Sequence, residues 1–108
     1  MPNNSIPELL EVMKIAKREL GSMVTVIYET EVFEFHDETP TAHSNIKRHE
    51  PIGGIYKNDY GYWTTYVWEY YPGSYEYPPE WVDRDIFMKS VTWQDAIKRL
   101  RVEWESNQ

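Results

Sequence analysis

The sequence predicts a single α+β domain over residues 1–108, a two-layer sandwich in the order α-β-β-β-(β)-α. We expect its sheet to be antiparallel and to carry both helices on one face. Three observations predict this class. Helical apolar periodicity marks the two ends of the chain, an alternation with a period of two fills the middle, and short turn-forming segments join the strands. A chain of 108 residues is long enough for one hydrophobic core.

The first helix is predicted to begin at Ser5, which forms an S-x-x-E capping box with Glu8. Pro7 falls in the first turn, where its missing N–H is not needed, and Gly21 is placed to end the helix. The apolar residues that recur at helical spacing are Ile6, Leu9, Leu10, Met13, Ala16 and Leu20.

The closing helix follows the same pattern. Thr92 is the expected N-cap, with Asp95 three residues later. Its apolar stripe consists of Trp93, Ile97, Leu100 and Trp104. Both helices are therefore amphipathic, and each needs an apolar surface to cover.

Between the helices, residues 23–35 predict one β-strand, with a bulge or bend near Glu31 because 13 residues exceed a typical strand. Residues 36–51 are polar and predict a long loop.

Residues 52–57 and 62–71 predict two strands of a hairpin around the connection 58–61, which ends in a glycine suited to positive φ. Pro72 ends the second of these strands, and residues 82–88 predict a short last strand before the closing helix.

Residues 60–81 contain ten aromatic side chains. The strand at 62–71 has rings on both faces, but two helices can cover only one face. One set is Tyr62, Tyr66, Trp68 and Tyr70, and the other is Trp63, Val67 and Tyr71. If the first set faces outward, its four exposed rings form an apolar patch of the kind used for binding.

Four interpretations of this patch stay open. Residues 72–81 could fold back as a lid over it. The rings could bind another protein, since Tyr and Trp are enriched at interface hot spots. The same face could join two copies of the chain in a homodimer, or the rings could wall a pocket for a planar ligand.

The net charge is −7, and its distribution favours a basic partner. Residues 29–89 contain twelve acids and five bases, which accounts for the whole excess, whereas both ends of the chain are balanced. Such a field repels nucleic-acid phosphates and anionic lipid and attracts basic proteins. We therefore expect a basic protein partner, no direct nucleic-acid binding and no membrane association.

Rings and carboxylates together match the Arg and Lys side chains of a partner, through cation–π contacts and ion pairs. The predicted partner- or ligand-binding residues are Tyr62, Tyr66, Trp68, Glu69, Tyr70, Glu76, Glu80 and Trp81.

No motif predicts catalysis, a metal or a cofactor. The chain has no cysteine, and the spacing of His36, His43 and His49 matches no zinc pattern. Asp83 and Asp85 could pair as acid and base, but an acidic chain produces such pairs by chance. No signal peptide or membrane span is predicted, so we expect a cytoplasmic protein.

The sequence thus favours a non-enzymatic interaction protein that docks an aromatic and carboxylate surface on a basic partner. Small acidic inhibitors of the immunity, antitoxin or phage anti-defence type have this physical profile. The alternative is a small-molecule binding protein with an aromatic pocket for a planar ligand, and a self-associating subunit is a third interpretation.

Overall fold

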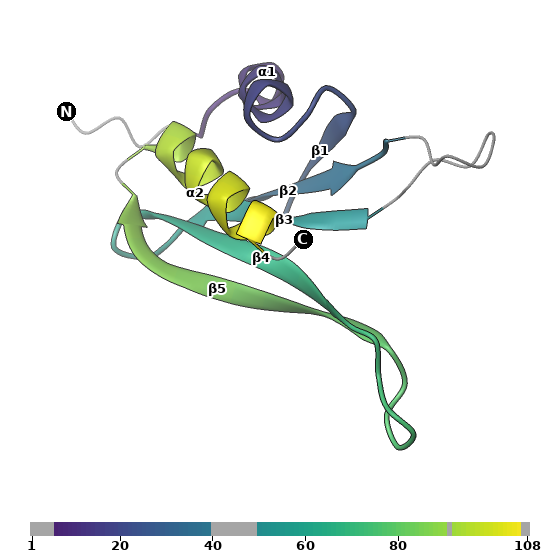
Figure 1. Cartoon of the computed structure of the whole chain (residues 1–108). Coiled ribbons are helices and arrows are strands. Elements are labelled where there is room, and N and C mark those ends of the chain that lie inside the picture. The colour runs from purple at the N-terminus through teal and green to yellow at the C-terminus, as the bar shows by residue number, and fades with distance from the viewer. Residues whose placement is uncertain (1–5, 40–49, 91, 107–108) are drawn as a thin grey trace.

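The computed structural model describes residues 6–39, 50–90 and 92–106, except the side chains of residues 87–89. It confirms the α+β class, because one five-stranded antiparallel sheet carries both helices on a single face (Figure 1). The elements are α1 (Leu9–Glu19), β1 (Val24–Glu29), β2 (Val32–Asp37), β3 (Glu50–Lys57), β4 (Trp63–Tyr71), β5 (Glu80–Ser90) and α2 (Trp93–Ser106). The strands follow one another across the sheet in chain order. Neither helix is long and apolar enough to span a bilayer, judged over the described ranges.

Helix α1 starts later than predicted. It begins at Leu9, and Glu8 takes the N-cap position with an extended backbone and no capping hydrogen bond from its side chain. The predicted capping box is therefore wrong at Glu8, and Ser5 lies outside the described residues. Pro7 precedes the helix, and Gly21 follows it with a φ of 140°.

The buried stripe of α1 also differs from the predicted one. It consists of Val12, Ala16 and Leu20, whereas Leu9 and Leu10 are exposed. Both sets have helical spacing, so periodicity alone could not choose between them.

The predicted long strand 23–35 is two strands. β1 and β2 form a hairpin around Thr30 and Glu31, whose φ angles are 52° and 63°. Two successive positive φ values are typical of a type I′ turn, which reverses the chain in two residues. Glu31 was the expected place of a bend, but the bend is a complete reversal. The alternating sequence pattern gives no sign of this turn, because a β-branched residue such as Thr30 rarely adopts positive φ.

The hairpin between β3 and β4 is confirmed. Asn58 N–H donates to the Tyr62 carbonyl at 2.8 Å, and the Asn58 side-chain oxygen accepts from the N–H groups of Tyr60 and Tyr62. Gly61 has the expected positive φ, 85°. The predicted loop 36–51 is too long at both ends, because its first two residues belong to β2 and its last two to β3. Residues 40–49 lie outside the described residues.

The last strand is longer than predicted: β5 covers 11 residues instead of 82–88. It pairs with β4 from Tyr71 opposite Glu80 up to Trp63 opposite Ser90. The outer part of this hairpin extends away from the rest of the domain (Figure 1). We call residues 70–81 the arm; every one of them is exposed.

The core lies between the sheet and the helices. Phe33 and Phe35 of β2 are fully buried there, as are Ile97 and Leu100 of α2, the helix that packs on β3 and β4. Replacing either Phe with Ala would cost about 3–5 kcal/mol. As predicted, Thr92 caps α2: its Oγ1 accepts the Asp95 N–H at 3.2 Å.

Because side chains alternate along a strand, the sheet has two distinct faces. We call the face covered by α1 and α2 the helix side and the other the open face. No described helix lies over the open face (Figure 1).

Candidate functional site

The structure settles which set of β4 rings faces outward. Trp63 and Val67 are buried on the helix side. Tyr66 and Trp68 therefore lie on the open face, and Tyr70 continues the row into the arm. Tyr62 immediately precedes β4 and is half-buried.

The central ring of the open face is not exposed, which corrects the expectation of four exposed rings. Tyr66 is only 8% exposed, because its ring lies across Gly54 of β3 between two neighbouring rings. The Tyr66 ring centroid is 6.3 Å from that of Tyr56 and 6.4 Å from that of Trp68, the latter in an edge-to-face arrangement. A Cβ at position 54 would meet the Tyr66 ring, so glycine makes this packing possible.

These rings form the floor of a groove on the open face. Its volume is about 380 Å³, within the lower range of ligand sites. The groove, which we call the open-face groove, is lined by Val32, Glu34, Tyr56, Tyr66, Trp68, Asp83 and Asp85.

Strand register explains how the acids reach the groove. Asp85 pairs with Tyr66 and Asp83 with Trp68, so both β5 carboxylates stand directly beside the rings. On the other side, Glu34 of β2 is opposite Gly54. The three carboxylates therefore flank an aromatic floor from both sides.

The groove has a negative electrostatic potential. Burial raises the pKa of Tyr66 well above its ordinary value, and the carboxylates of Glu34, Asp83 and Asp85 raise it further. The pKa of Tyr56 is also raised, first by burial and then by Asp85, whose Oδ1 accepts from the Tyr56 hydroxyl at 3.5 Å. Burial disfavours a charge of either sign, but the part of these pKa shifts that the carboxylates cause reflects a field that would favour a bound cation.

The Trp68 ring is fixed in place. Its Nε1–H donates to Glu34 Oε1 at 2.5 Å, and Glu34 Oε2 lies 3.8 Å from His36 Nε2. Together with the edge-to-face contact to Tyr66, this hydrogen bond presents the indole in one orientation.

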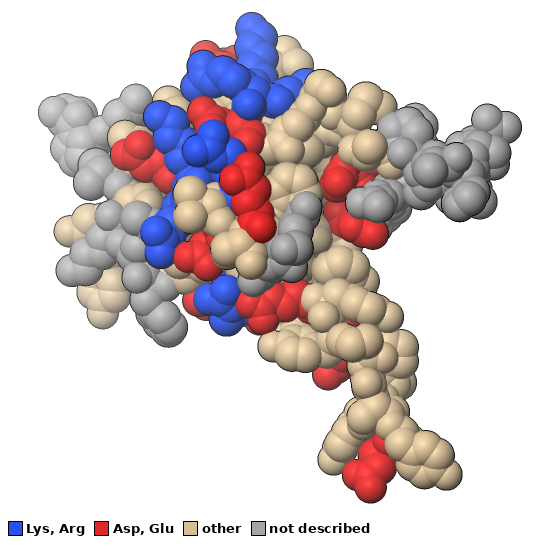
Figure 2. Space-filling model, viewed as in Figure 1, with Lys and Arg blue, Asp and Glu red and all other residues tan. Residues whose placement is uncertain are grey.

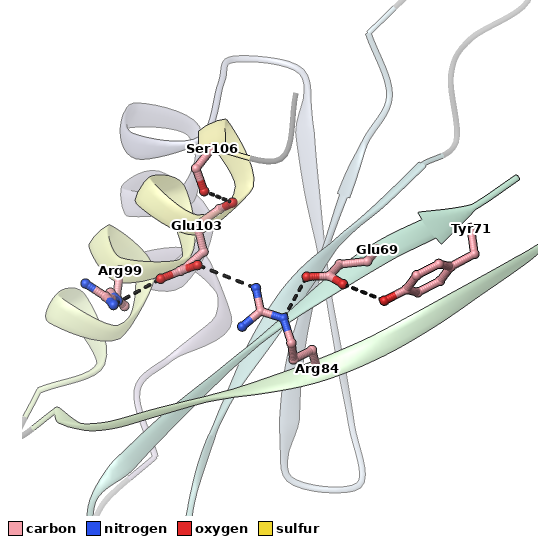
Figure 3. Close-up of polar contacts among 6 residues, drawn as sticks. All are labelled: Glu69, Tyr71, Arg84, Arg99, Glu103 and Ser106. Atoms are coloured by element: carbon pink, nitrogen blue, oxygen red, sulfur yellow. Dashed lines mark hydrogen bonds and ion pairs between the residues drawn. The ribbon is translucent and has the colours of Figure 1, made fainter.

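Glu69 was predicted to act with these rings, but it lies on the helix side. Arg84 Nε donates to Glu69 Oε1 at 2.6 Å, and Arg84 Nη2 lies 3.6 Å from Glu103 Oε2 of α2 (Figure 3). Glu103 also pairs with Arg99 at 3.0 Å, and the Tyr71 hydroxyl donates to Glu69 at 3.0 Å. The helix-side acids of this network are thus matched by arginines.

The arm carries the remaining predicted residues, Glu76, Glu80, Tyr70 and Trp81. Tyr70 and Trp81 face each other across the two strands with ring centroids 5.2 Å apart. Glu76 is at the tip, and Glu80 begins β5. Because residues 72–81 project outward, the lid interpretation is wrong (Figure 1).

The arm tip is a defined turn. Ser74 and Tyr77 exchange two backbone hydrogen bonds, at 2.9 and 3.3 Å, and Ser74 Oγ accepts the Glu76 N–H. Gly73 has a φ of 84° and packs so closely on Tyr77 and Pro78 that a Cβ would be 2.7 Å from the Tyr77 carbonyl oxygen. The exposed Tyr75 and Tyr77 are therefore held by an ordered backbone.

Positive charge gathers on the helices. Figure 2, which views the molecule as Figure 1 does, shows Lys and Arg clustered over them, whereas the arm shows acids among uncharged residues. Among the described side chains, each Lys and Arg belongs to a helix or to the helix side of the sheet. The open face has carboxylates and rings instead.

Sequence reasoning missed five groove residues as binding candidates: Val32, Glu34, Tyr56, Asp83 and Asp85, the last two of which it treated as a chance pair. A signal for the pair was present, because two acids at alternate positions of a strand share one face. Their position beside Trp68 and Tyr66 depends on the β4–β5 register, which the sequence pattern did not supply.

No protein-family model matches this chain, and neither the curated proteins nor the solved structures contain a match.

Proposed function

We propose that this chain is a non-enzymatic interaction protein that docks its open face and arm on a basic surface of a partner protein. In this proposal it acts as an inhibitor of the immunity, antitoxin or phage anti-defence type in the cytoplasm. Its carboxylates occupy a cationic groove of the partner in place of phosphate groups.

One observation carries the proposal: the division of charge between the two faces. On the helix side, Glu69 and Glu103 are paired with arginines. On the open face, Asp83 and Asp85 form no ion pair with any Lys or Arg side chain that the structure describes. Unneutralised carboxylates beside aromatic rings favour a cationic partner, which they attract over long range and bind at short range.

The arm adds apolar contact area to this surface. Tyr75 is fully exposed, and Trp81 is 40% exposed. Aromatic side chains contribute large contact areas at interfaces, and a preformed turn lowers the entropy lost on binding. The acidic open face would therefore steer the encounter, and the rings would supply affinity.

A charge-reversal experiment tests the docking face. The tagged protein is used as bait in three forms: wild type, Asp83→Lys/Asp85→Lys, and Glu11→Lys/Glu105→Lys. Both variants change the net charge equally, but Glu11 and Glu105 are exposed residues of the helices. We expect wild type and the helix variant to retain the same basic protein and the open-face variant to lose it.

Retention should also weaken as salt increases, because exposed charges are screened. Far-UV circular dichroism checks that both variants keep their helices. The proposal fails if all three baits retain the same proteins equally, or if the proteins lost by the open-face variant are acidic.

The burial of each ring decides whether its substitution can test binding. Tyr66→Ala would disturb packing because Tyr66 is buried, whereas Trp81 lies on the arm and contacts Tyr70. Trp81→Ala should therefore weaken the partner complex while the domain stays folded. Unchanged affinity of the folded variant for the captured partner would exclude the arm from the interface.

The groove volume supports a second candidate function, binding of a planar small ligand. A site of about 380 Å³ with ring walls is large enough for one. A change in tryptophan fluorescence on adding such a ligand, with no partner protein present, would favour this alternative.

A further inference from the structure

The two β5 carboxylates of the open-face groove have a spacing that suits one planar cation. Asp83 and Asp85 are alternate residues of a strand, so their side chains leave the same face about 7 Å apart along it. Arg84 lies between them in sequence but projects to the opposite face, where Glu69 and Glu103 bind it. Arg84 therefore does not neutralise Asp83 or Asp85, its two neighbours in the sequence.

The groove also offers ring surfaces beside these acids. Asp83 pairs across the strands with Trp68, and Asp85 pairs with Tyr66. The Trp68 indole is oriented by Glu34, and the Tyr56 hydroxyl contacts Asp85. Cavity, ring walls and carboxylates are three separate features that coincide at one place.

We propose that the open-face groove binds the side chain of an arginine from the partner protein, with its guanidinium held between Asp83 and Asp85 and against the rings of Tyr66 and Trp68. This inference rests on the proposed function and names the chemistry of its central contact. Arginine fits better than lysine, because the planar guanidinium stacks on aromatic rings and donates hydrogen bonds from both ends. A lysine ammonium is compact and strongly hydrated, so it would gain less from the ring walls.

The electrostatics of the groove support this choice. The pKa values of Tyr56 and Tyr66 are raised partly by the same carboxylates, so the groove already disfavours added negative charge. A guanidinium would offset one of the two aspartate charges and donate hydrogen bonds to both carboxylates without any proton transfer, because it stays charged at all accessible pH values.

The test uses N-acetyl-arginine N-methylamide as the probe and the ¹⁵N-labelled whole chain. The Trp68 indole N–H resonance, identified by its loss in Trp68→Phe, reports on binding. We expect a saturable shift with a dissociation constant on the order of millimolar, as suits a single side chain. The citrulline analogue has the same shape without the charge and should bind at least about tenfold more weakly. The lysine analogue should also bind more weakly than arginine.

Two isosteric variants assign the site. Asp83→Asn/Asp85→Asn should weaken arginine binding by about tenfold or more, whereas Glu11→Gln/Glu105→Gln, which changes the net charge equally, should leave it unchanged. Equal binding of the arginine and citrulline analogues, or equal binding by both variants, would overturn the proposal. Free arginine that binds tenfold more tightly than the blocked form would overturn it in favour of a metabolite site.

The outcomes separate this inference from the proposed function. If the charge-reversed open face loses its partner but the blocked arginine causes no shift, docking stands and the arginine site is wrong. If the blocked arginine binds but charge reversal leaves partner capture unchanged, the partner interpretation is wrong and only the affinity for a guanidinium stands.

Discussion

Gly54→Ala is expected to destabilise the domain through one identified contact, the Tyr66 ring. A Cβ at position 54 would lie 2.5 Å from both Cε1 and Cζ of Tyr66, so the ring has to move off β3. Full exposure of a large apolar side chain costs roughly 1.5–3 kcal/mol. Replacing a strand glycine with Ala returns roughly 0.5–1 kcal/mol of backbone entropy. The net loss should be about 1–2 kcal/mol, a fall in Tm of roughly 5–10 °C.

A double-mutant cycle measures this contact by urea denaturation followed by circular dichroism. In a Tyr66→Ala background no ring is left to collide with, so Gly54→Ala should be neutral or stabilising by up to about 1 kcal/mol. Equal costs of Gly54→Ala in the two backgrounds would refute the reasoning, because the destabilisation would then have another source.

The neighbouring glycine provides a matched control. A Cβ at Gly53 would collide with the Tyr66 carbonyl oxygen and lie 2.7 Å from Leu100 Cδ1. The carbonyl belongs to the backbone and persists in Tyr66→Ala. The cost of Gly53→Ala should therefore stay large in both backgrounds, which separates a side-chain collision from a general intolerance of Ala in β3.

Three further predictions follow from single residues. Thr92→Ala removes the cap that accepts the Asp95 N–H and should lower the free energy of unfolding by about 1 kcal/mol in urea denaturation. The folded-state pKa of Tyr66 is raised above the ordinary value near 10. The neutral Tyr66 side chain therefore stabilises the fold fully below about pH 10, and this contribution is lost as the pH rises further. Tyr66→Phe should consequently lose less stability than wild type between about pH 9 and pH 11. Glu76→Lys at the arm tip should slow association with the captured partner and flatten its salt dependence in stopped-flow measurements, and an unchanged rate would exclude the tip from steering.

The fold class could be predicted because its signals are local. Thr92 and Gly61 occupy positions for which their residue types have a strong preference, a helix N-cap and a turn position with positive φ. The turn at Thr30 and Glu31 was missed because neither residue is typical of positive φ. As a result, one long strand was expected where the chain reverses. The reversal places Phe33 and Phe35 on the same face as Val24 and Val26, whereas one continuous strand would place them on the opposite face.

The candidate site could be predicted only in part. The sequence shows which residue types are present, but strand pairing decides which of them lie side by side. The sequence identified the rings of β4 and a surplus of acids. Which acids stand beside which rings depends on register: Asp83 is opposite Trp68, whereas Glu69, the immediate neighbour of Trp68, faces the helices. The burial of Tyr66 depends on Gly54, a residue 12 positions away in β3.

The alternation Asp83-Arg84-Asp85 shows how a strongly acidic chain can keep its helix layer balanced. Adjacent residues of a strand face opposite sides, so Arg84 lies on the helix side, whereas Asp83 and Asp85 lie on the open face. Arg84 then offsets repulsion between Glu69 and Glu103, which belong to different elements. Exposed charges at the open face cost little stability while water solvates them. The same arrangement that protects the packed layer therefore leaves the acidic surface able to bind a cation from outside.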